Sequence, residues 1–164
     1  MRIRSRIFGD IEIAADDVVV FPGGIPPFTE LQQYCVLSAE AEPGLRWLQA
    51  VDEPSIAFAV MPPAAIAGQY DIEISDADAA ELQLERAEEA EVLVILAVHE
   101  QPRRVTANLR APIVINRRRQ LGKQVMLNDT QHPLQYVLRT EDEISEPSCA
   151  AAQCPCGDNG KEQR

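Results

Sequence analysis

A loop with two glycines and three prolines between two phenylalanines most constrains how this chain can fold. It runs Phe21-Pro22-Gly23-Gly24-Ile25-Pro26-Pro27-Phe28. Proline fixes φ and removes a backbone donor, so neither a helix nor a central strand can pass through this stretch. Glycine supplies the positive φ values of a tight turn, and the apolar side chains can anchor the turn on a core. The sequence therefore predicts a rigid loop that suits the recognition of another protein.

Short strands account for most of the chain on both sides of this loop, because β-branched and aromatic residues alternate with glycine and proline turns. Residues 2–7 alternate with a period of two, which predicts that Ile3, Ser5 and Ile7 share one face. Residues 92–98 are all apolar, which predicts a fully buried central strand. Further strands are expected near residues 11–13, 18–21, 34–37, 47–51, 56–61, 105–109, 113–115, 124–127 and 136–138. The sequence predicts a mainly β fold, a small antiparallel β-barrel-like or sandwich domain.

One short helix is expected after Ser75, which can cap it, with Asp78 three residues on as a variant of the capping box. Its end is expected near residues 85–89. The length of 164 residues suits one domain. From residue 141 the apolar periodicity ends and Glu, Ser, Pro, Gly, Ala and Gln dominate. We expect a domain over residues 1–140 and a disordered tail over residues 141–164.

The four cysteines are unevenly placed. Cys35 lies in an apolar strand-like stretch and is expected in the core. The tail carries Cys149, Cys154 and Cys156, whose spacing does not match a common zinc site. We interpret them as loose thiols, with metal binding or oxidation as the alternative. The sequence predicts neither a structural metal nor a cofactor.

Charge is strongly segregated along the chain, whose net charge of −11 disfavours nucleic acid and anionic membrane as primary partners. Residues 71–91 hold nine acidic residues and one arginine, whereas residues 103–123 hold seven basic residues and no acid. The first block is either a solvated face or an electrostatic surface that steers a basic partner. We expect that surface at Glu81, Glu85, Glu88 and Glu89. The second block is either a surface hairpin or an RNA contact through Arg117, Arg118, Arg119 and Lys123, although it lacks aromatic stacking partners.

Catalytic motifs are missing from the sequence. Neither His99 nor His132 has metal-ligand spacing, and there is no nucleophile elbow, P-loop or dinucleotide fingerprint. This favours a binding protein over an enzyme, with a small-molecule-binding or catalytic barrel as an alternative. The N-terminus lacks the apolar stretch of a signal peptide, and the apolar runs are too short to span a membrane, so we expect a cytoplasmic protein.

Four segments in order resemble the flagellar assembly factor FliW family. They are residues 6–13 with the proline loop, residues 51–60, residues 107–116 and residues 122–125. The resemblance covers residues 1–140 and implies a β-barrel-like fold. It also implies a non-enzymatic regulator that binds CsrA, an RNA-binding translational regulator, and relieves its repression of flagellin mRNA translation. A second implied partner is flagellin, which is bound in a chaperone-like partner switch.

The resemblance also implies contact residues. The segment at residues 61–68 is rich in alanine and proline where relatives are expected to carry bulkier aromatic residues. An alternative role for each contact residue is a turn or core position, with Gly23 and Pro54 as turn formers and the two asparagines satisfying buried backbone groups. The predicted partner-binding residues are Phe21, Pro22, Gly23, Ile25, Pro26, Phe28, Asp52, Pro54, Asn108, Pro112 and Asn116.

Overall fold

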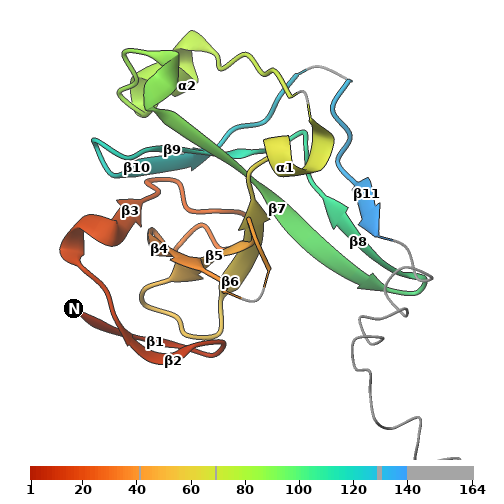
Figure 1. Cartoon of the computed structure of the whole chain (residues 1–164). Helices are drawn as coiled ribbons and strands as arrows, with labels where there is room; N and C mark the ends of the chain where they lie inside the picture. Colours follow the sequence, from red (N-terminus) through yellow and green to blue (C-terminus); the bar gives the residue numbers. More distant parts are fainter. Residues whose placement is uncertain (41, 69, 129–130, 140–164) are drawn as a thin grey trace, which may run out of the picture.

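A closed barrel of seven strands forms the centre of the fold (Figure 1). The computed structural model describes residues 1–40, 42–68, 70–128 and 131–139. Neighbouring strands are antiparallel except where β10 closes the barrel against β3 in a parallel pairing of Leu121 with Val20. Around the barrel the strands are β3 (Val18–Val20), β4 (Gln33–Ser38), β5 (Arg46–Ala50), β6 (Ala57–Met61), β7 (Ala90–Glu100), β9 (Ile113–Asn116) and β10 (Leu121–Gln124).

The remaining elements decorate this barrel. An N-terminal hairpin joins β1 (Arg2–Ser5) to β2 (Gly9–Glu12), and β8 (Arg103–Ala107) and β11 (Tyr136–Arg139) extend the sheet outward from β7. The helical elements are α1 (Ala64–Ala67), α2 (Asp76–Glu81) and the 3-10 turns η1 (Ala15–Asp17) and η2 (Ala87–Glu89). The prediction of a small, mainly β barrel is confirmed. The structure adds α1, which begins where Pro62 and Pro63 end β6, because proline is compatible with the first turn of a helix.

The prediction that residues 92–98 form a fully buried strand is wrong for its second half. Leu93 and Val94 are completely buried, but Val98 is 63% exposed. The first half of β7 pairs with β9 in the barrel, whereas residues 96–100 pair with β8 outside it (Figure 1). The unbroken apolar run therefore forms one strand whose first half is buried in the barrel and whose second half lies outside it and is partly exposed.

Three smaller expectations also have clear outcomes. Ile7 is 48% exposed, because β1 ends at Ser5, whose hydroxyl accepts hydrogen bonds from the N–H groups of Ile7 and Phe8. Ser75 caps α2 as predicted, accepting from the N–H of Asp78 at 3.1 Å, but the helix ends at Glu81, before residues 85–89. Cys35 is buried in the core, as expected. The predicted tail with Cys149, Cys154 and Cys156 lies outside the described residues.

The proline loop is anchored on the main core. Phe21 and Ile25 are completely buried, and the Phe21 ring meets Tyr34 edge-on with centroids 5.2 Å apart. Gly24 has a φ of +67°, and a Cβ there would lie 2.5 Å from the Cα of Thr29. Two tight backbone hydrogen bonds, Gly24 N–H to Phe21 O and Phe28 N–H to Ile25 O, stiffen the turn. The loop is fixed by packing and by its own backbone.

We predict that Gly122→Ala destabilises the barrel by about 1–3 kcal/mol, the usual range for overpacking a core. The added Cβ would lie 2.7 Å from Cε1 of Phe21, a ring with no room to move. Gly23→Ala is the matched control, because nothing lies within 4 Å of its new Cβ. Urea unfolding should show the loss for Gly122→Ala and a change within about 0.5 kcal/mol for the control. Equal stability of the two variants would contradict the packing at Gly122.

Candidate functional site

The proline loop, β10 and the end of α2 together line a groove of about 330 Å³. Its apolar walls include Pro22, Pro26, Leu82 and Met126, and the Met126 side chain is 62% exposed. Glu81 and Lys123 lie at the same groove and form an ion pair of 2.7 Å. An apolar centre beside paired charges is typical of a protein-binding surface. We define the loop-side residues Pro22, Gly23, Pro26 and Met126 as the loop face.

The structure separates the predicted contact residues of the loop into two groups. Phe21 and Ile25 are completely buried and hold the loop on the core, while Phe28 is half-buried against Phe58. Pro22, Gly23 and Pro26 are exposed in the loop face. Partner contact stays a prediction for the loop, and the exposed residues are those that can make it without rearrangement.

Asp52 and Pro54 lie in the turn between β5 and β6 and do not line the groove. Asp52 is exposed, whereas Pro54 is half-buried and its carbonyl accepts a hydrogen bond of 3.0 Å from the Arg6 N–H. This contact ties the turn to the end of the β1–β2 hairpin. Their role in partner binding stays a prediction.

Asn116 joins the end of α2 to the turn that follows β9. Its side chain is buried, and its Nδ2 donates to the carbonyls of Leu82 and Gln83 at 2.9 and 3.0 Å. Its Oδ1 accepts from the N–H groups of Arg118 and Arg119 at 3.1 and 3.3 Å. Four hydrogen bonds therefore connect backbone segments more than thirty residues apart, and they position Leu82 in the groove.

Asn108 and Pro112 act on the other side of the same region. The Asn108 Oδ1 accepts from the N–H groups of Arg110 and Ala111, which closes a turn. Pro112 is buried, and its carbonyl accepts from the Val125 N–H at 2.9 Å. These contacts set the path of the segment that carries Met126, so both residues have a positioning role here.

Ion pairs bring the acidic and basic blocks of the sequence together. Lys123 Nζ lies 2.6 Å from Asp78 and 2.7 Å from Glu81, and Arg118 lies 2.6 Å from Glu89. The hydrogen bond to Asp78 is the main cause that raises the pKa of Lys123. The expected acidic surface is therefore divided, because Glu81 and Glu89 are paired. Glu85 and Glu88 are exposed and take part in no ion pair within the described residues.

Glu91 pairs with two arginines. It accepts from Arg46 and, at 2.5 Å, from Arg117, and so links β5, β7 and the turn after β9. Burial would raise its pKa, but hydrogen bonds and charges of Arg117 and Arg46 outweigh burial and hold the pKa below its ordinary value. With Arg117, Arg118 and Lys123 already paired, the basic hairpin has much less free charge to offer RNA phosphates than its sequence indicates.

Chemically reactive groups are sparse in the described part of the chain. Burial, with a smaller effect of the Asp17 charge, raises the pKa of the Cys35 thiol to about 11, so it is a poor nucleophile. His99 Nε2 lies 2.9 Å from the Thr106 hydroxyl, so this ring nitrogen has a hydrogen-bond partner on the neighbouring strand. Among these residues no three His, Cys, Asp or Glu gather in a group that could hold a metal ion. No helix among them is long and apolar enough to cross a membrane.

Sequence reasoning missed two features of this region. Met126 was not singled out, because one exposed methionine in a short strand-like segment carries no motif. The pairing of Lys123 with Asp78 and Glu81 was also missed, although the opposite charges of the two blocks were a usable signal. The sequence does not reveal the strand register, and the register determines which individual charges lie opposite each other.

Comparison with known proteins gives a consistent result. The sequence model described as "FliW protein" matches residues 2–138. A flagellar assembly factor FliW of Alkaliphilus metalliredigens is 34% identical over 164 residues, covering 99% of this chain and all of the relative. That of Geobacillus kaustophilus is 39% identical over 141 residues, covering 86% and 97%. A crystal structure of the flagellar assembly factor FliW superposes with a TM-score of 0.78 at 36% identity, covering 85% of this chain and 97% of that one.

We predict that Glu91→Gln lowers the free energy of unfolding by about 1–3 kcal/mol at pH 7, because a neutral amide leaves the arginines without their charged acceptor. The lowered pKa of Glu91 means that its stabilisation is present at neutral pH and is lost as the pH falls below its ordinary value of 4.5. The difference between wild type and variant should therefore shrink in acid.

Urea unfolding between neutral and acid pH measures this difference. Glu88→Gln is the matched control, because Glu88 is exposed and makes no ion pair within the described residues, and it should change stability by less than about 0.5 kcal/mol. If the loss of unfolding free energy in Glu91→Gln does not change with pH, the result would contradict the stabilising role assigned to the charge of Glu91.

Proposed function

This chain belongs to the FliW family of flagellar assembly factors, and we propose that it acts in flagellar assembly as a non-enzymatic, protein-binding regulator. Its proposed partner is CsrA, the RNA-binding translational regulator, whose repression of flagellin mRNA translation it relieves by binding. Flagellin is the proposed second partner, so that export of flagellin frees this chain for CsrA. The proposed place of action is the cytoplasm.

The observation that carries this proposal is the loop face. Its exposed prolines, Pro22 and Pro26, sit on a loop that two buried side chains anchor, so little conformational entropy is lost when a partner binds. The two charged groups that line the groove, Glu81 and Lys123, are held in an ion pair with each other. A rigid, apolar surface beside paired charges favours protein recognition over catalysis.

The acidic block supports the proposed effect on RNA in a revised form. Because Glu81 and Glu89 are paired internally, the charge available to repel phosphates comes from Glu85 and Glu88 near η2. A carboxylate held beside an RNA-binding surface raises the free energy of bringing in phosphate groups. CsrA bound next to these residues would thus lose affinity for RNA without having its RNA groove filled.

We predict that Met126→Glu weakens binding to CsrA, flagellin or both by at least about tenfold, because it places a charge in the apolar centre of the contact. Met126 is already 62% exposed, so the fold should tolerate the change. Leu134→Glu is the matched control, since Leu134 is 48% exposed and does not line the groove. Calorimetric titration of each purified partner measures the affinities. Unchanged affinity for both partners would contradict contact through the loop face.

We predict that Glu85→Lys with Glu88→Lys reduces the displacement of RNA from CsrA more than it reduces binding to CsrA. The reversed charges no longer repel phosphates, whereas the ion pairs of Glu81 and Glu89 stay intact. Titration of CsrA with and without a target RNA separates the two effects, and raised salt should diminish the difference. Equal loss of binding and of displacement would contradict the electrostatic mechanism.

A further inference from the structure

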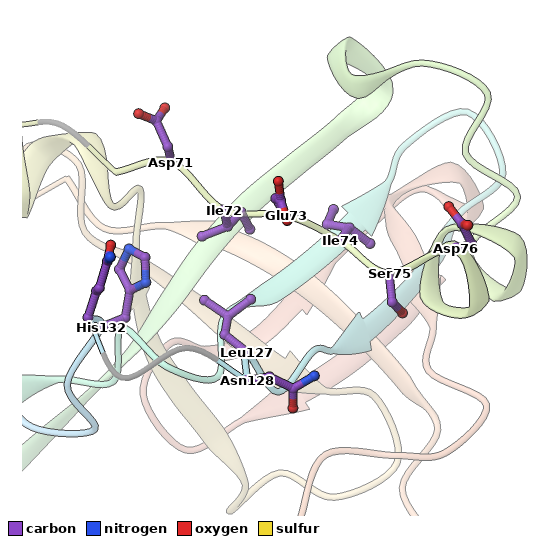
Figure 2. Close-up of a pocket in the computed structure, with 10 residues that line it drawn as sticks. Asp71, Ile72, Glu73, Ile74, Ser75, Asp76, Leu127, Asn128 and His132 are labelled. Carbon is purple, nitrogen blue, oxygen red and sulfur yellow. The ribbon is translucent and has the colours of Figure 1, made fainter.

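An extended segment between α1 and α2 forms one wall of a cleft of about 890 Å³ (Figure 2). The segment alternates in burial, with Asp71 and Glu73 exposed and Ile72 and Ile74 half-buried. The two isoleucines pack on a core cluster that includes Leu127, which lies on the other side of the cleft with Asn128. This alternation is that of a β-strand with one face on the core.

The segment nevertheless pairs with no strand. Within the described part of the chain, the backbone N–H and C=O groups of residues 71–74 make no hydrogen bond, and no bond joins this segment to Leu127 or Asn128. It therefore presents a strand-like edge whose donors and acceptors are open to another chain. The cleft beside this edge is large enough for side chains of an added strand.

Charge decides what kind of strand fits. Asp71, Glu73 and Asp76 all line the cleft and take part in no ion pair within the described residues. They differ in this from Asp78, Glu81, Glu89 and Glu91, which the basic block neutralises. Three carboxylates that form no ion pair with a described residue therefore lie along the open edge. Basic side chains on a strand that pairs with this edge would interact favourably with them.

We propose that this cleft binds an extended segment of a protein partner in which lysine or arginine alternates with apolar residues. The segment adds as a strand along residues 71–75. Its basic side chains share the outer face with Asp71 and Glu73, and its apolar side chains cover Ile72, Ile74 and Leu127. Backbone hydrogen bonds supply the affinity that does not depend on the sequence of the bound segment. The alternating side chains supply the specificity, as in other cases of strand addition. The surface is separate from the loop face and does not require CsrA or flagellin as its partner.

The probe is a blocked pentapeptide, Lys-Val-Lys-Val-Lys, added to the full-length isotope-labelled protein up to about 1 mM. We expect amide shifts at residues 71–76 and 127–128 that saturate with one peptide per chain, and no such shifts with Glu-Val-Glu-Val-Glu. Asp71→Lys with Glu73→Lys should weaken binding by at least about tenfold, because like charges then oppose the peptide. Asp16→Lys with Glu40→Lys is the matched control, since both residues are exposed and lie outside the cleft.

A second pair of peptides separates strand addition from general attraction between opposite charges. One is N-methylated at its valines and the other at its lysines, which removes donors from alternate edges of the peptide without changing its charge. Strand addition predicts that one of them loses at least about tenfold in affinity while the other keeps most of it. No saturable shift with the basic peptide, equal weakening by the two double variants, or equal binding of the two methylated peptides would each overturn the proposal. None of these outcomes bears on CsrA binding through the loop face.

Discussion

The contact between the Phe21 ring and Gly122 is the constraint on which the rest of this structure depends. It lies where β10 meets β3 in the parallel pairing that closes the barrel. The same ring is the inner anchor of the proline loop and packs on Tyr34 in the main core. The same side-chain contact therefore closes the barrel and positions the loop. The shape of the loop face is for this reason determined by the core and not by the loop sequence alone.

Charge compensation is the second level of organisation. Two blocks that are strongly acidic and strongly basic in sequence fold against each other, and within the described residues four of the nine acidic and three of the seven basic side chains form ion pairs. Because Glu91, Glu89 and Lys123 each have partners, the field that reaches solvent comes from fewer residues than the sequence indicates. Within the acidic block, the carboxylates that form no ion pair with a described residue fall on two segments, residues 71–76 and residues 85–88, and each segment can therefore influence a different neighbour.

The sequence was sufficient for the local features and insufficient for those that depend on register. Most strand positions, the Ser75 cap and the buried Cys35 follow from short-range patterns of polarity and hydrogen bonding and were predictable. The strand expected near residues 124–127 is an exception, because β10 lies at Leu121–Gln124. The exposure of Val98 was not, because it depends on where β7 leaves the barrel. Met126 was not predictable either, since its exposure is set by the paths of residues that Asn108 and Pro112 hold. The same limit applies to ion pairs, because composition reveals opposite charge but not which side chains meet.

The helix α2 links the two candidate binding surfaces and is too short to be stable by itself. Six residues form fewer than two turns, a length at which the cost of helix nucleation is not recovered. Its position therefore depends on three external anchors: the Ser75 cap, the ion pairs of Lys123 with Asp78 and Glu81, and the bonds from Asn116 to the carbonyls of Leu82 and Gln83. The segment before α2 lines the acidic cleft, and the residues at its end line the loop-face groove. Loss of an anchor would displace both surfaces together, whereas substitutions at Asp71, Glu73 or Met126 leave all three anchors in place and act on one surface alone.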